Sequence, residues 1–77
     1  MIEQDIKLIA EHIHNFAIGQ LGNDPKQHFE ATTHYFNYVD IRLLQMEREY
    51  KSARLPNDWI DNIVALVRSD LQSRIRS

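Results

Sequence analysis

The chain has no cysteine, only two glycines and two prolines, and no long apolar run. Without cysteine, neither a disulfide nor a thiolate zinc site can form. No stretch approaches the roughly 18 apolar residues that span a membrane. The first five residues also lack the basic segment and apolar block of a secretory leader. We therefore expect a cytoplasmic protein that has no membrane partner.

Motifs for catalysis and for cofactor binding are missing as well. The segment Gly19-Gln20-Leu21-Gly22 lacks the pattern and the following lysine of a phosphate-binding loop. The serines lie in the C-terminal third of the chain, with no nucleophile-elbow glycines and no histidine near them in sequence. We expect no enzymatic activity, no catalytic residue and no cofactor.

The charges are nearly balanced, with a formal net charge of −2 and an isoelectric point near 6.0. Such a chain has no overall attraction to nucleic acid or to an anionic membrane. Hydrophobic residues make up 43% of the sequence, so wholesale disorder is not expected. At 77 residues, however, a single core is only marginally sufficient, and help from a partner or a second copy is expected.

Residues 2 to about 20 have the pattern of an amphipathic helix. Ile2, Ile6, Ile9, Ile13 and Phe16 recur at alternating spacings of three and four residues, which places them on one helical face. Glycines follow, and Gly22 is a candidate for the left-handed position that ends a helix.

A long middle helix is predicted over residues 25–54. Asp24, Pro25 and Gln27 form its start signal, with a capping aspartate, a proline at the first helical position and a capping-box glutamine. The apolar seam is expected at Phe29, Thr32, Phe36, Val39, Leu43, Met46, Tyr50 and Ala53. The helix is predicted to end at Leu55-Pro56, since proline disfavours helical geometry in the preceding residue.

A third helix is predicted over residues 58–75, with a broad apolar sector that indicates burial against two neighbours. The sequence thus predicts one domain, residues 1–77, with an all-α fold: a three-helix antiparallel bundle with a long central helix. The predicted core consists of Ile6, Ile9, Ile13, Phe16, Phe29, Phe36, Val39, Leu43, Met46, Trp59, Ile63, Val67 and Leu71.

The predicted middle helix would be about 45 Å long and its flanking helices about 30 Å. In addition, His34, Tyr38, Ile41 and Leu44 form a second patch at helical spacing, away from the seam. Surplus length and a second apolar patch favour a homodimer through this helix. In the alternative interpretation, the two flanking helices cover both faces within a monomer.

Histidines and glutamates suggest a weaker alternative. Glu11-x-x-His14 has the spacing used in carboxylate-bridged di-metal bundles, and Glu30 and His34 lie one turn apart. Only one Glu-x-x-His element is present, however, so we predict no metal site. The histidines, at positions 12, 14, 28 and 34, also raise the question of a pH-dependent interface.

The other alternative is a nucleic-acid-associated transcriptional regulator that uses the basic end of the middle helix, at Arg42, Arg48, Lys51 and Arg54. Acidic residues interleave with these, and Glu47-Lys51 is an i,i+4 pair, which favours a solvated ion-paired face. Nucleic acid is therefore not expected as a direct ligand.

The segment Asp40-x-Arg42-Leu43, followed by Pro56 and Trp59, resembles the closing segment of the Hha/YmoA family of small helical regulators. This resemblance covers less than a third of the chain, and the tryptophan is displaced by one position. It implies a regulator that binds nucleoid-structuring proteins.

Taken together, these patterns predict a small non-enzymatic regulator or adaptor that covers the working face of a partner protein. Tyrosine and arginine are enriched at interface hot spots. The expected contact residues are Tyr35, Tyr38, Ile41, Arg42, Leu44 and Arg48.

Overall fold

The structure is a computed structural model that describes residues 3–22 and 24–76. Three helices form it: α1 (Glu3–Gln20), α2 (Phe29–Ser52) and α3 (Asn57–Arg76). Within the described residues there is no strand, which confirms the all-α prediction. Ile2, with which the first predicted helix begins, lies outside the described residues.

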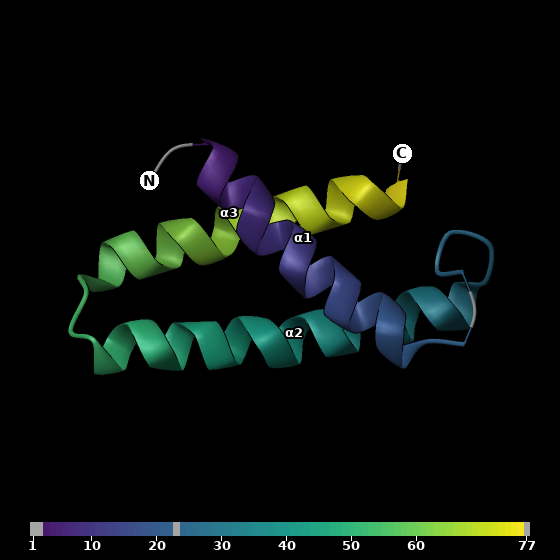
Figure 1. The fold of residues 1–77 in the computed structure, drawn as a ribbon, viewed down its shortest axis with the longest axis horizontal. Coiled ribbons are helices and arrows are strands. Elements are labelled where there is room, and N and C mark those ends of the chain that lie inside the picture. The colour runs from purple at the N-terminus through teal and green to yellow at the C-terminus, as the bar shows by residue number, and fades with distance from the viewer. Residues whose placement is uncertain (1–2, 23, 77) are drawn as a thin grey trace.

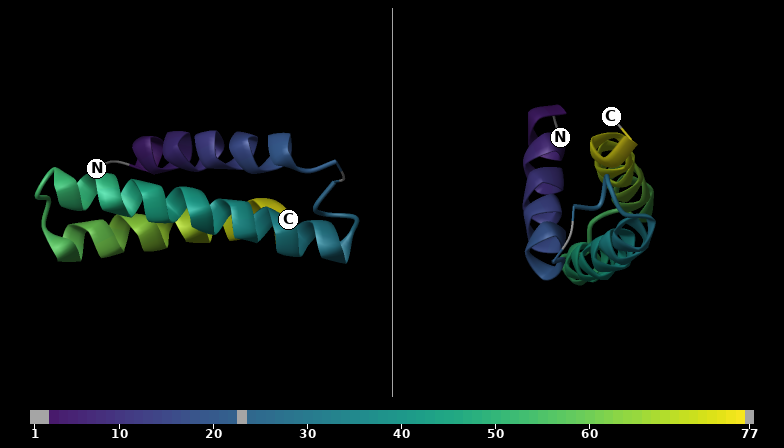
Figure 2. Two further views of the ribbon diagram at one scale, coloured as in Figure 1. Left: turned by 90° about the horizontal axis from the view of Figure 1, so that it is seen from below. Right: turned by 90° about the vertical axis from the view of Figure 1, so that its right-hand side faces the viewer.

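Helices α2 and α3 lie side by side and are joined at one end by residues 53–56 (Figure 1). Helix α1 lies obliquely across both of them, in a layer of its own (Figures 1 and 2). All three pairs of helices are in contact, and the molecule measures 39 × 21 × 16 Å along its principal axes. Alanines on α1, Ala10 and Ala17, are fully buried, as expected where helices approach closely at a crossing.

The middle helix begins at Phe29, four residues later than predicted. The Asp24 side chain accepts a hydrogen bond from the amide of Lys26 at 2.9 Å, and its carbonyl accepts one from the amide of Gln27 at 3.2 Å. Asp followed by Pro is also the preferred opening of a β-turn, so the same residues that can start a helix form a turn here. His28 is the N-cap, and its side chain makes no capping bond.

The C-terminus of α2 is closed by a Schellman motif. The amide of Leu55 donates to the carbonyl of Tyr50 at 3.2 Å, and the amide of Arg54 donates to that of Lys51 at 3.0 Å. Arg54 has a φ of 62°, the only positive φ among residues 3–22 and 24–76. The left-handed residue is thus Arg54, and the assignment of Gly22 to such a position was wrong.

The buried core is built from helical stripes on all three helices. Most of the predicted members are confirmed: seven of them are buried, and Ile9, Phe36, Met46 and Trp59 pack against these as partly buried residues. The buried hydrophobic residues are Ile6, Ala10, Ile13, Ala17, Ala31, Tyr35, Val39, Leu43, Ile60, Ile63, Val67 and Leu71.

In the first half of α2, the buried face differs from the predicted seam. Phe29, a predicted core residue, is 86% exposed, whereas Tyr35 is fully buried. The buried residues Ala31, Tyr35, Val39 and Leu43 recur at every fourth position. Because a helix has 3.6 residues per turn, such a stripe drifts around the helix axis. A seam that alternates between three and four residues follows a helix that runs alongside, whereas α1 crosses α2 obliquely (Figure 1).

Candidate protein-contact surface on the middle helix

The six residues predicted to contact a partner lie in three different environments. Tyr35 is buried in the core, and it is therefore not a surface contact of this chain. Tyr38 and Arg42 lie on the flank of α2 beside Phe16 of α1. The remaining three are exposed on α2 and are Ile41, Leu44 and Arg48.

We call Ile41, Leu44 and Arg48 the outer face of α2. Ile41 is 50% exposed and Leu44 is 47% exposed. At about 100° per residue, Ile41 and Arg48 lie roughly opposite Val39 and Leu43, which are buried in the core, and Leu44 lies about 100° around the helix from Leu43. The flanking helices α1 and α3 therefore leave this face uncovered.

The flank of α2 is organised by aromatic contacts. The ring of Tyr38 meets Phe16 edge to face, with 6.2 Å between the centroids and 84° between the planes. The guanidinium carbon of Arg42 lies 4.8 Å from the centroid of Phe16, in a cation–π contact. Arg42 also donates a hydrogen bond to Gln45 Oε1 at 3.2 Å. Tyr38 and Arg42 are thus held in place before any partner binds.

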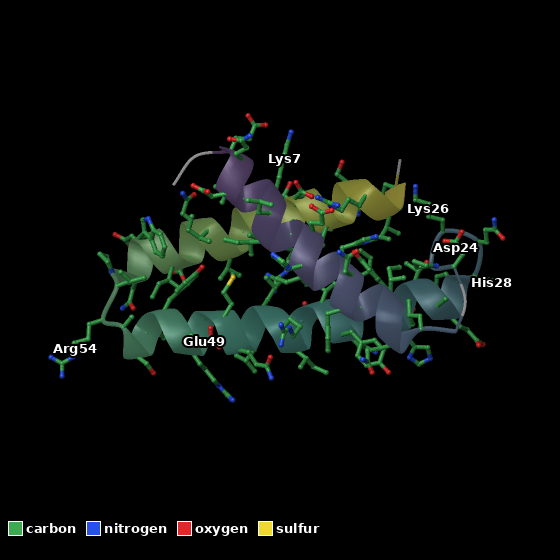
Figure 3. The ribbon with its side chains drawn as sticks, in the orientation of Figure 1. Lys7, Asp24, Lys26, His28, Glu49 and Arg54 are labelled. Atoms are coloured by element: carbon green, nitrogen blue, oxygen red, sulfur yellow. The ribbon has the colours of Figure 1, made fainter. Side chains whose placement is uncertain are left out.

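Next to this flank, a shallow groove of about 200 Å³ runs between α1 and α2. Its apolar floor is formed by Ile9, Ile13 and Met46, and its rim carries the polar side chains of His12, Arg42, Gln45 and Glu49. Glu49, which is labelled in Figure 3, shows where the groove lies along α2. The groove is smaller than the 300–1,000 Å³ that is typical of small-molecule sites.

Tyr35 connects α2 with α1 inside the core. Its hydroxyl lies 2.8 Å from His14 Nδ1, and the two rings meet edge to face with centroids 5.6 Å apart. Burial raises the pKa of Tyr35 to about 12, so its hydroxyl keeps its proton. The apolar spacing of α2 gave no signal for this role, because Tyr35 falls one position before Phe36 of the predicted seam.

Several charges of the basic end of α2 are paired or stacked. Lys51 Nζ lies 2.9 Å from Glu47 Oε1, as the i,i+4 spacing predicted. Arg42 is stacked on Phe16, and Arg54 lies at the far end of the bundle, at the turn into α3 (Figure 3).

The imidazoles lie on α1, at positions 12 and 14, and at or near the start of α2, at positions 28 and 34. Across residues 3–22 and 24–76, no group of three or more histidine, aspartate and glutamate side chains is placed to hold a metal ion. His14 of the Glu11-x-x-His14 element is bonded to Tyr35, while His34 is exposed on α2.

Other apolar side chains are exposed outside the predicted contact set. The most prominent are Leu8 on α1, Phe29 at the start of α2 and Leu66 on α3. Leu8 is 54% exposed, close to the value for Ile41, and it provides a matched control on a different helix. In the described part of the chain, no helix has the length and apolar character needed to cross a membrane.

Comparison with known proteins found no matching family model, no matching curated protein and no matching solved structure. The resemblance to the Hha/YmoA family consequently rests on the residues between Asp40 and Trp59 alone.

Proposed function

We propose that this protein is a small non-enzymatic regulator that binds another protein through α2 and covers part of that protein's surface. The observation that carries this contact is the flank of α2, where Tyr38 and Arg42 are held against Phe16. A second contact through α2 is supported by the pair Ile41 and Leu44, half exposed on the side of the helix that faces away from the core. Isoleucine and leucine side chains at i,i+3 form one apolar strip. Burying such a strip is favourable at roughly 25 cal/mol per Å² of apolar area.

The outer face and the flank have different chemistry, and we assign them different roles. The outer face, with Ile41 and Leu44 at its centre, contacts a second copy of the chain and forms a homodimer. Two-fold packing brings the same strip of both copies together, which is the usual geometry of a homodimer. The flank, with Tyr38 and Arg42 fixed against Phe16, contacts the regulated protein. Preorganised tyrosine and arginine side chains lose little conformational entropy on binding.

We further infer an antiparallel arrangement of α2 and α3. The connection over residues 53–56 spans at most about 18 Å from helix to helix. Helix α3 has 20 residues and is about 30 Å long. So short a connection cannot return the chain to the far end of the bundle.

Light scattering of the purified full chain tests the dimer. We expect twice the monomer mass of 9.1 kDa for the native chain, and the monomer mass for Ile41→Asp, because the charge would be buried at the two-fold contact. Leu8→Asp, at a site of similar exposure on α1, is expected to keep the dimer. A native monomer, or a dimer that persists in Ile41→Asp, would show that the outer face does not join two copies.

Pull-down from cell extract tests the regulator. A specific partner is expected to be lost with Tyr38→Ala and retained with Leu8→Asp, while circular dichroism confirms that each variant is folded. If the same proteins are captured by all baits, or none by the native bait, the regulator proposal fails regardless of the oligomeric state.

A further inference from the structure

His14 and Tyr35 form a partly buried hydrogen bond between α1 and α2. His14 of α1 is partly buried and Tyr35 of α2 is fully buried, with 2.8 Å between Nδ1 and the hydroxyl oxygen. We propose that His14 and Tyr35 form an acid-sensitive clamp that holds α1 on α2. This inference concerns how the bundle is held together and is independent of the proposed function.

The surroundings of His14 disfavour a positive charge on its ring. Arg74 of α3 and Lys26 of the connection between α1 and α2 are the nearby cations, while Glu11 on the same helix acts in the opposite direction. Arg74 Nε is itself 2.6 Å from Asp70 Oδ1, which reduces but does not remove its influence. Burial, followed by Arg74 and Lys26, lowers the pKa of His14 below its usual value of 6.5.

Protonation changes the hydrogen bond as well as the charge. A neutral imidazole has one donor and one acceptor nitrogen. The clamp requires the tautomer with the hydrogen on Nε2, in which Nδ1 accepts the hydrogen bond from the Tyr35 hydroxyl. When a solvent proton is added to the ring, both nitrogens become donors. The hydroxyl must then turn to accept from Nδ1, and its own hydrogen loses the imidazole as acceptor. Because the pKa of Tyr35 is about 12, the hydroxyl cannot adjust by releasing its proton.

The direction of the effect on stability follows from proton linkage. The unfolded chain, in which His14 has its ordinary pKa, binds this proton more tightly than the folded chain does. The contribution of the clamp to the free energy of unfolding is therefore fully present above pH 6.5. It decreases as the pH falls from 6.5 towards the lower pKa of His14 in the folded state. Within that interval the unfolding equilibrium constant rises by up to tenfold per pH unit.

His12, His28 and His34 differ from His14 in their exposure. All three are exposed, whereas His14 is partly buried. His14 is also bonded to Tyr35 of α2, so its titration reports on whether α1 is docked.

The clamp is tested by NMR titration of the histidine rings in the native chain, which requires no substitution. His14 is expected to titrate below pH 6.5. If it titrates at 6.5 or above, the clamp is not acid-sensitive and the proposal is overturned.

A double-mutant cycle provides the second test. Urea unfolding is measured at pH 7.5 and pH 5.5 for the native chain, His14→Gln, Tyr35→Phe and the double variant, with His12→Gln as the control. The coupling free energy between positions 14 and 35 is expected to stabilise the fold at pH 7.5 and to be smaller at pH 5.5. His12→Gln is expected to keep the acid-induced loss of stability, and His14→Gln to reduce it. A coupling near zero at pH 7.5, or one that does not change with pH, would contradict the clamp.

Discussion

The two ends of the bundle are closed in different ways. At the end where α1 meets α2, side chains add bonds to those of the backbone: Asp24 holds the turn, the Thr32 hydroxyl donates to the carbonyl of Pro25, and Tyr35 bonds to His14. At the end where α2 meets α3, the backbone closes the helix through the amides of Arg54 and Leu55, and Tyr50 and Trp59 pack edge to face. One end thus depends on particular polar groups, and the other on backbone geometry and apolar contact.

This difference has consequences for how each end responds to change. Polar bonds inside a protein are lost when one partner is removed or changes its protonation state, and the group left behind is then unsatisfied. Backbone bonds at a helix terminus are retained through most side-chain substitutions, because they depend on φ and ψ. We therefore expect large single-residue effects at the α1–α2 end and smaller ones at the α2–α3 end.

The largest effect is expected at Tyr35. Removing a buried aromatic ring costs about 3–5 kcal/mol through lost burial and the cavity left behind. The total free energy of unfolding of a 77-residue domain is on the order of 4–12 kcal/mol. Tyr35→Ala is therefore expected to lower the free energy of unfolding by about 3–5 kcal/mol, a large share of the total, as measured by urea unfolding followed by far-UV circular dichroism.

Phe29→Ala is the matched control for this prediction, because it removes an aromatic ring from the same helix at a site that is 86% exposed. Its effect is expected to stay within about 0.5 kcal/mol. Comparable losses of stability for the two variants would show that the core does not include Tyr35 in the way described.

These two aromatic residues also show how far the sequence predicts the fold. The three helices and most core positions of α1 and α3 follow from periodicity, since each presents one regular stripe to its neighbours. The stripe of α2 was misplaced in its first half, where Phe29 was preferred to Tyr35. Periodicity predicts which face of a helix is buried when its neighbour runs alongside it. It carries no information about the angle at which α1 crosses α2.

The start of α2 was misjudged for a local reason. An Asp-Pro pair fits both the first turn of a helix and the opening of a β-turn, and the choice between them depends on tertiary contacts. Here Pro25 is buried and its carbonyl accepts a bond from Thr32, so the turn folds back onto the helix that follows it. Neither contact is visible in the sequence.

Which of the six predicted contact residues are available to a partner depends on their exposure in the folded chain. These six residues share one helix and a composition typical of interfaces, but the sequence does not say which of them already pack within the chain. Tyr38 and Arg42 already contact Phe16, whereas Ile41 and Leu44 are about half exposed.

An intermediate effect is expected from Trp59 at the α2–α3 end. Its ring is partly buried and meets Tyr50 with centroids 5.3 Å apart at 70°. Trp59→Ala is expected to cost about 2–3 kcal/mol, less than a fully buried aromatic residue. Urea unfolding followed by circular dichroism measures it.

A double-mutant cycle with Tyr50→Ala separates the ring contact from the burial of each ring. The coupling is expected to be about 0.5–1.5 kcal/mol and equal at pH 7.5 and pH 5.5, because the contact contains no imidazole. A coupling that falls with acidification, as expected for His14 and Tyr35, would remove the distinction between the two ends.

The smallest effect, and one of opposite sign, is expected at Arg54. A side chain at φ 62° brings its Cβ close to the following carbonyl oxygen, at a cost of roughly 1 kcal/mol, and glycine avoids this contact. Arg54→Gly is therefore expected to raise the free energy of unfolding by up to about 1 kcal/mol. Arg54→Ala, which keeps the Cβ, is expected to leave it unchanged. If Arg54→Gly were destabilising while Arg54→Ala remained neutral, the strain at this position would be smaller than the entropy that glycine adds to the unfolded chain. In that case the left-handed conformation of Arg54 would not reduce the stability of this helix end.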